Sequence, residues 1–156
     1  MTIFSPEITT LLLGMVPLIE LRGAIPYGMT VLGLEAHIAF FYALLGNVLV
    51  VLSIPFLGAV SSYLSKRWYA WNRLFAWVFE RTRKNHHRAF LTYRDLALVL
   101  IVAIPLPLTG AWAASVASFL FGIPFTRALP LITMGLCIAG FIMILIVGGF
   151  SRIMGV

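Results

Sequence analysis

Charged residues are scarce in this chain, and acidic ones are the scarcest. Of its 156 residues, 10% are charged, five are aspartate or glutamate, and 62% are hydrophobic. A soluble domain of this length needs far more polar surface to cover its core. The mean hydropathy of +1.04 points the same way. The composition excludes an ordinary soluble domain and predicts an integral membrane protein.

Cysteine and histidine are also too few to build a disulfide framework or a metal site. Cys137 is the single cysteine, so it forms no internal disulfide and is expected to be a small buried hydrophobic residue. The three histidines, at 37, 86 and 87, show no ligand spacing. No hydrolase triad or phosphate-binding glycine loop is visible. We therefore expect no metal, no cofactor and no enzymatic activity.

Basic residues, in contrast, gather in one central segment. Eight lie there, interrupted by a single glutamate: Lys66, Arg67, Arg73, Arg81, Arg83, Lys84, Arg88 and Arg94. Because lysine and arginine concentrate in cytoplasmic loops of membrane proteins, this pattern predicts a cytoplasmic segment rather than a nucleic-acid site. Its aromatic residues fall on one helical face, which is typical of a helix that lies on anionic lipid headgroups. The alternative is a topology determinant without lipid preference.

The chain divides into four apolar stretches on either side of this basic bridge. They cover approximately residues 8–34, 36–64, 96–125 and 128–150. As a single membrane domain it is expected to hold a first repeat (1–65), the cytoplasmic amphipathic bridge (66–95) and a second repeat (96–156). The opening stretch has no basic residue before Arg22, so it lacks the n-region of a cleavable signal peptide.

Stretches one and three are interrupted near their middles. The first offers about twelve apolar residues before Glu20, and a helix that short covers roughly half of a 30 Å hydrocarbon core. Pro17 and Pro26 are expected to bracket an unwound segment, and Pro105 to Gly110 a second one. Such backbone is tolerated at membrane depth only where protein or a water-filled cavity satisfies it. Two re-entrant hairpins are predicted; two kinked spanning helices are the alternative.

A weak internal repeat supports the hairpins. Val16-Pro17-Leu18 matches Ile104-Pro105-Leu106, and Gly46 matches Gly135, at offsets of 88 and 89 residues. Chance similarity between apolar segments is the alternative. A repeat with an odd number of crossings forces its successor to be inverted. The predicted fold is therefore all-α, with two inverted repeats, each a re-entrant hairpin plus a transmembrane helix. Both termini should face outside, whereas four spanning helices would place both in the cytoplasm.

Glu20 and Arg22 are the leading site candidates, because ionisable residues inside apolar segments are costly and usually face partners or water. At membrane depth Glu20 is expected to exchange protons near neutral pH unless Arg22 holds it ionised. Arg22 offers a planar fork for phosphate or carboxylate. The alternative leaves both charges at an interface. The remaining candidates for substrate or ion binding lie at the two breaks: Gly23, Pro26, Pro105, Pro107, Thr109, Gly110 and Trp112. Trp112 has packing or interface anchoring as its alternative.

Two motifs, Glu20-Leu21-Arg22-Gly23-Ala24-Ile25-Pro26 and Pro105-Leu106-Pro107-Leu108-Thr109-Gly110-Ala111-Trp112, make the chain resemble the small multidrug export protein family. That family looks like a distant, minimal relative of the DedA/VTT membrane proteins. The relation implies paired inverted hairpins and movement of lipids such as undecaprenyl phosphate, coupled to a cation or proton gradient. It implies that Glu20 is the acidic residue of the first hairpin. DedA proteins carry arginines in the second hairpin, whereas none lies between Arg94 and Arg127 here.

These observations favour a multi-pass transporter or lipid translocase of the cytoplasmic membrane. Its expected substrate is anionic or lipid-linked, such as a polyprenyl phosphate, with proton or cation coupling. The first alternative is proton-coupled export of lipophilic cations, and the second is a non-transporting scaffold or assembly factor. Because four membrane segments make a thin wall around any pathway, a homo-oligomer is expected, with membrane lipids as further partners.

Overall fold

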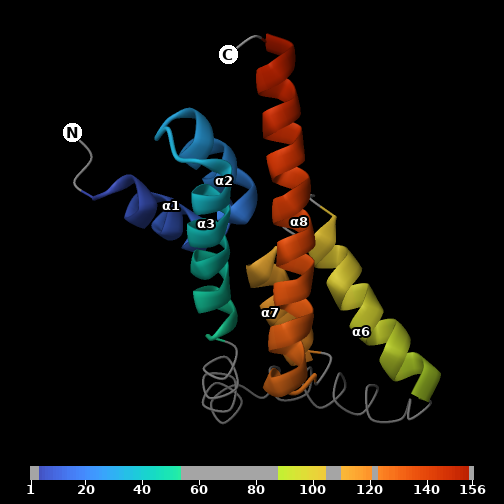
Figure 1. Ribbon diagram of the computed structural model, residues 1–156. Coiled ribbons are helices and arrows are strands. Elements are labelled where there is room, and N and C mark those ends of the chain that lie inside the picture. The colour runs from blue at the N-terminus through green and yellow to red at the C-terminus, as the bar shows by residue number, and fades with distance from the viewer. Residues whose placement is uncertain (1–3, 54–87, 105–109, 121–122, 155–156) are drawn as a thin grey trace.

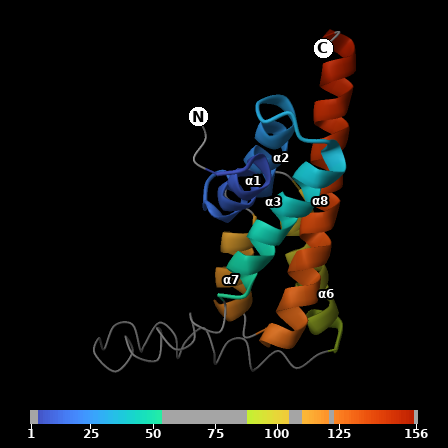
Figure 2. The ribbon, with the colours of Figure 1, turned by 60° about the vertical axis from the view of Figure 1, so that its left-hand side comes forward.

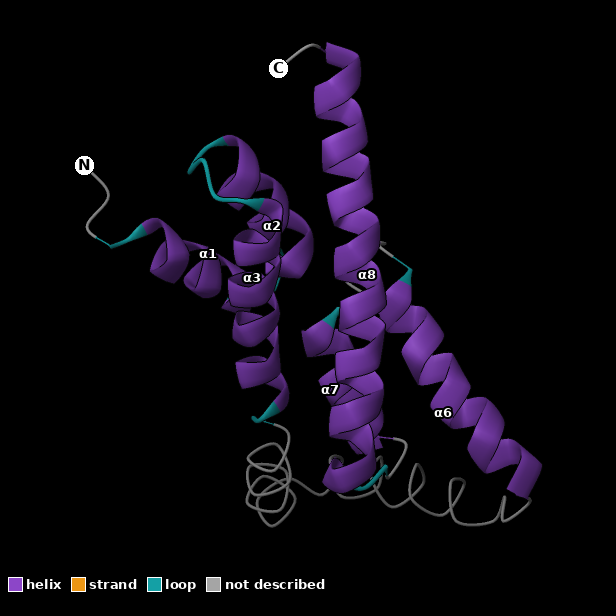
Figure 3. Cartoon of the chain, viewed as in Figure 1, coloured by secondary structure: helices purple, strands orange, loops and turns teal. Residues whose placement is uncertain are grey.

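The computed structural model describes residues 4–53, 88–104, 110–120 and 123–154 (Figure 1). Within these ranges the chain forms helices and no strand, as the sequence predicts (Figure 3). The helices are α1 (Pro6–Met15), α2 (Glu20–Thr30), α3 (Ala36–Val51), α6 (Arg88–Ala103), α7 (Ala111–Leu120) and α8 (Phe125–Met154).

The first interruption is shorter than expected. α1 begins with a Ser5 cap and ends at Met15, and α2 begins at Glu20, so the backbone leaves the helix only over residues 16–19. The prediction that Pro17 and Pro26 bracket an unwound segment is wrong at its second end, since Pro26 lies inside α2. A proline there removes one helical hydrogen bond. Burial of the apolar face of α2 outweighs that loss, because tertiary packing supplies most helix stability.

The second interruption lies where the sequence places it. α6 ends at Ala103 and α7 starts at Ala111, and Figures 1 and 2 show the two helices running in opposite senses. Residues 105–109 between them lie outside the described ranges. α6 begins at Arg88, so the end of the expected bridge (88–95) belongs to this helix rather than to a separate one. The rest of the bridge lies outside the described residues.

α3 and α8 lie side by side and run in opposite directions (Figures 1 and 2). Within the described part of the chain, one helix is long and apolar enough to cross a membrane, over Phe125–Phe150 of α8. Its 26 residues span about 39 Å, more than the hydrocarbon core of a bilayer. α3 is apolar but shorter, and its expected continuation to residue 64 is described only to Ser53.

Glycines let the helices approach closely. A Cβ at Gly46 of α3 would overlap the backbone carbonyl of Leu11 in α1. In the second half of the chain, a Cβ at Gly135 of α8 would press on Val102 and on the carbonyl of Val99, both in α6. Small residues at such crossings permit the van der Waals packing that holds membrane helices together. A glycine thus lets each helix that precedes a break pack closely against a longer apolar helix, α1 against α3 and α6 against α8.

Candidate functional site

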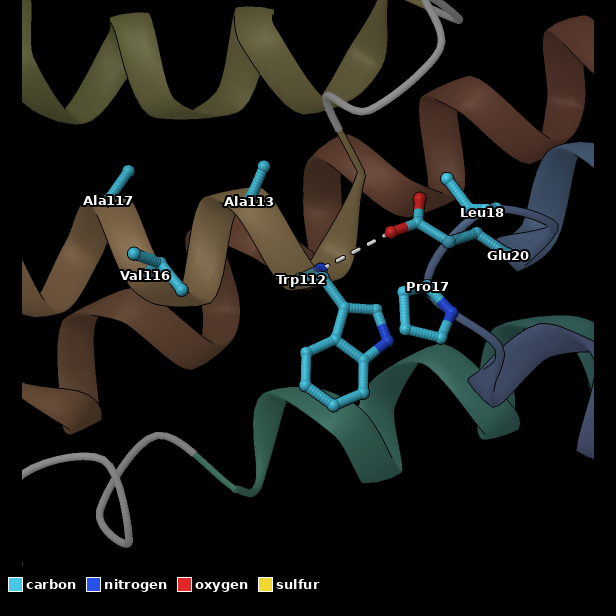
Figure 4. A pocket seen from close by; sticks show the side chains of 7 residues that line it. All are labelled: Pro17, Leu18, Glu20, Trp112, Ala113, Val116 and Ala117. Carbon is cyan, nitrogen blue, oxygen red and sulfur yellow. Dashed lines mark hydrogen bonds between the residues drawn. The ribbon is translucent and has the colours of Figure 1, made fainter. Parts of the chain in front are cut away.

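The carboxylate of Glu20 joins the first break to the second. Glu20 is 4% exposed and has a φ of 47°, a left-handed conformation that is uncommon for residues other than glycine. Its Oε1 accepts a hydrogen bond of 3.3 Å from the backbone N–H of Trp112 (Figure 4). A Cβ at Gly110 would overlap the same carboxylate. The absence of a side chain at Gly110 is therefore what admits Glu20.

Glu20 lies at the N-terminus of α7, where the first backbone N–H groups have no partner within the helix. The Ala111 amide also faces the carboxylate. A negative charge at this end of a helix is favoured by the helix dipole and by these free donors. The side chain from the first break thus caps the helix that follows the second.

Trp112 makes a second bridge between the breaks. Its indole Nε1–H donates a hydrogen bond of 2.9 Å to the carbonyl of Met15, the last residue of α1. The carbonyls at a helix C-terminus lack partners within the helix, so this bond satisfies one of them. The backbone of Trp112 holds Glu20 while its side chain holds the end of α1, which fixes the two breaks against each other.

Arg22 contacts the other end of the second break. Its guanidinium donates a hydrogen bond of 3.2 Å to the carbonyl of Ile104, the residue after α6. It also interacts electrostatically with Glu20. The two charged side chains of the first break therefore contact both sides of the second, Arg22 at the end of α6 and Glu20 at the start of α7.

An open pocket of about 470 Å³ adjoins this contact. It is lined by Pro17, Leu18, Glu20, Trp112, Ala113, Val116 and Ala117 (Figure 4). Figure 4 shows the Glu20 carboxylate beside the start of α7 and the Trp112 indole beside Pro17. Among these residues the carboxylate is the single charged group, and the other side chains are aliphatic or aromatic. The pocket suits an apolar ligand that carries positive charge.

The structure brings together Glu20, Gly110 and Trp112, and it places Arg22 next to them. Gly23 is half-buried in α2, against the side chain of Ile19 one helical turn earlier. Pro26 is half-buried in the same helix. Three further candidates, Pro105, Pro107 and Thr109, lie outside the described residues.

Sequence reasoning missed the pocket wall that α7 supplies. Ala113, Val116 and Ala117 continue the surface begun by Trp112. Residues three and four positions apart share one face of a helix, so a helix starting at the second break would have placed them there. Small apolar residues carry no chemical signature of their own, and only their spacing from Trp112 points to them.

Comparison with known families decides the class of the protein. A family described as "Putative small multi-drug export protein" matches residues 20–142, a range that begins at Glu20, directly after the first break, and includes the second break. The chain belongs to this family. The match confirms the resemblance seen in the two motifs. Family membership and the apolar span of α8 together identify a membrane protein. No curated protein and no solved structure shows significant similarity to the chain.

Proposed function

We propose that this family member exports lipophilic cations across the membrane, and that cargo and proton compete for the carboxylate of Glu20. The observation that carries this proposal is the position of Glu20. It is buried at the contact between the two breaks and is also the charged group in the wall of the apolar pocket. The family's description as a multi-drug exporter supports the same class of activity.

The pocket wall favours a cation over the anion that the sequence favours. An indole attracts cations through its π face, and apolar walls take up the organic part of a lipophilic ion. Arg22 was the expected anion ligand, but its guanidinium is bonded to the Ile104 carbonyl and is not part of the described pocket wall. A carboxylate without a lining cation repels anionic cargo.

Exchange at one carboxylate explains how export is coupled to protons. Arg22 interacts electrostatically with Glu20 but is not part of the described pocket wall, so on the pocket side a proton or the cationic cargo is the positive partner of the buried carboxylate. Between these states the N-terminus of α7 holds Glu20 through the Trp112 amide. Cargo release then requires protonation, so a proton gradient drives the cycle.

The path is proposed to run between two inverted repeats. Gly46 packs against the carbonyl of Leu11, and Gly135 packs against the carbonyl of Val99. The two glycines are 89 residues apart in the sequence, and the two carbonyl residues are 88 apart. These offsets equal those of the sequence repeat, and α3 and α8 run in opposite directions. Both observations support two re-entrant hairpins that enter from opposite faces, with residues 66–95 in the cytoplasm and both termini outside.

Transport of an anionic or lipid-linked substrate is the second candidate. It is favoured by the convergence of Arg22 and the α7 N-terminus on one carboxylate, because an anion that displaced Glu20 would find donors already in place. The proposed relation to DedA proteins points to the same substrate class. In this mechanism transport also depends on displacement of Glu20, but the cargo is negatively charged.

A second copy of the chain is proposed to close the pocket. The pocket is open on one side, and Leu18 at its rim is 80% exposed. In a bilayer that opening would leave Glu20 facing lipid tails, where a carboxylate is unfavourable. A homo-oligomer supplies the missing wall.

Equilibrium binding of tetraphenylphosphonium to the purified protein tests the proposal. Wild type should bind with an affinity that increases with pH, because protons compete for the same carboxylate. The Glu20→Gln variant should lose at least about tenfold in affinity, or 1.4 kcal/mol. The matched control is Glu35→Gln, which changes an exposed carboxylate paired with His37. Binding of a prenyl phosphate without any binding of tetraphenylphosphonium would replace the proposal by the second candidate.

A further inference from the structure

The open pocket extends along α7, away from its charged end. The charged group, the carboxylate of Glu20, lies at the N-terminus of α7 beside the Trp112 amide (Figure 4). The pocket residues that follow on the helix are Ala113, Val116 and Ala117, which we call the apolar strip. At a rise of about 1.5 Å per residue, the helix advances about 7.5 Å from Trp112 to Ala117. The pocket therefore has one charged end and an apolar wall that continues beyond it.

Two alanines keep the space over this strip free. Ala113 and Ala117 are four residues apart, so they lie on one face of α7, and Figure 4 shows their methyl groups on the same side of the helix. Both residues are half-buried. Because both line the pocket, a larger side chain at either position would take up part of the volume that a ligand can fill.

The charged end of the pocket is held in place from both breaks. The Trp112 amide donates to the Glu20 carboxylate, and the Trp112 indole donates a hydrogen bond of 2.9 Å to the carbonyl of Met15. A cation that pairs with this carboxylate is therefore bound at a defined position at the start of α7. The apolar part of the same ligand can cover the α7 wall only by extending along the strip toward Ala117.

We infer that Ala113 and Ala117 select the cargo by the shape of its apolar part, and that the preferred cargo is a slender organic cation with its charge at one end. The inference rests on the proposed export of lipophilic cations and specifies the form of the cargo. Each methylene group that covers apolar surface adds to the affinity. About six methylene groups reach from the charged end to Ala117, at about 1.25 Å each for C–C bonds of about 1.5 Å.

The test uses alkyltrimethylammonium ions with chains from methyl to decyl. Equilibrium binding to the purified full-length protein is measured for wild type, Ala113→Leu and Ala117→Leu. The ratio of variant to wild-type dissociation constant is compared at each chain length, which cancels partition of the chain into detergent. In Ala117→Leu this ratio should stay within about threefold for short chains and reach at least about tenfold from hexyl onward. In Ala113→Leu the loss should begin at shorter chains, from about propyl.

Matched variants separate this effect from general damage. Ala97→Leu makes the same change at an exposed position of α6 and should match wild type at every chain length. Ala113→Val and Ala117→Val add less bulk and provide the same comparison should a leucine variant fail to fold. They should show the same dependence on chain length with smaller ratios.

The failure of this inference is distinguishable from failure of the proposed export. Ratios that do not depend on chain length, with binding that still requires Glu20, would overturn the inference and leave the export of cations standing. Binding of tetraphenylphosphonium by wild type without binding of any alkyltrimethylammonium ion would do the same. If wild type bound neither kind of cation, the proposed function and the inference would both be overturned.

Discussion

The carboxylate of Glu20 occupies the space that a side chain at Gly110 would need. Ninety residues of chain separate them. The pair brings the two breaks into contact, and it makes Gly110 a steric requirement of the site.

Gly110→Ala should therefore push Glu20 away from the N-terminus of α7. We expect cation transport to fall at least about tenfold, because misplacing a reacting group by about 1 Å can cost a hundredfold. The measurement is transport by reconstituted protein of confirmed monodispersity. Gly148→Ala is the control, since a Cβ there meets no atom within 4 Å. Equal loss in the two variants would show that the effect is not specific to Glu20.

Substitution of Arg22 separates the two candidate substrate classes. In the exporter, Arg22 positions the end of α6 through the Ile104 carbonyl, so Arg22→Lys should retain cation binding within about threefold. Binding of an anionic substrate would depend on the bidentate fork, which lysine cannot reproduce. Arg127→Lys, at an exposed position, serves as the control. A complete loss of tetraphenylphosphonium binding in Arg22→Lys would contradict the proposed role.

Trp112 should contribute through its aromatic face as well as its hydrogen bond. Trp112→Ala is expected to weaken binding of tetraphenylphosphonium about 5- to 30-fold, the range of a desolvated cation–π contact of 1–2 kcal/mol. Trp112→Phe keeps an aromatic ring but loses the bond to the Met15 carbonyl, so it should mainly lower stability, by about 1 kcal/mol. Phe141→Ala, on the exposed side of α8, provides a comparison that should leave binding unchanged.

The two glycine contacts predict equal sensitivity in the two halves of the chain. Gly46→Ala and Gly135→Ala should each lower the free energy of unfolding by about 1–3 kcal/mol, because the added methyl group forces apart helices already in contact. Gly149→Ala should be neutral or stabilising by up to about 1 kcal/mol, since it meets no neighbour and alanine favours the helix. Unchanged stability in Gly46→Ala would remove the support that this contact gives to the repeat.

The two interruptions could be anticipated from the sequence, because short apolar stretches and prolines mark helix ends. The length of the first break could not. Pro26 is a helix breaker by its chemistry, yet burial of its neighbours Leu21 and Ile25 keeps α2 helical through it. Tertiary packing of this kind leaves no local signal.

The partner of Arg22 was equally hidden. Its hydrogen bond ends on a backbone carbonyl, which every residue has, so nothing in the sequence distinguishes Ile104 as the acceptor. The acid at the first break was visible because a charged residue in an apolar segment is rare.

Proton-driven transport by the Glu20→Gln variant is the most direct test of the account. Proteoliposomes with an imposed pH gradient are loaded with tetraphenylphosphonium, and the gradient-dependent flux is compared among wild type, Glu20→Gln and Glu35→Gln. Glutamine preserves an acceptor for the Trp112 amide but holds neither a proton nor a cation by charge. We expect wild-type flux in Glu35→Gln and no gradient-dependent flux in folded Glu20→Gln. Wild-type flux in Glu20→Gln would contradict the mechanism.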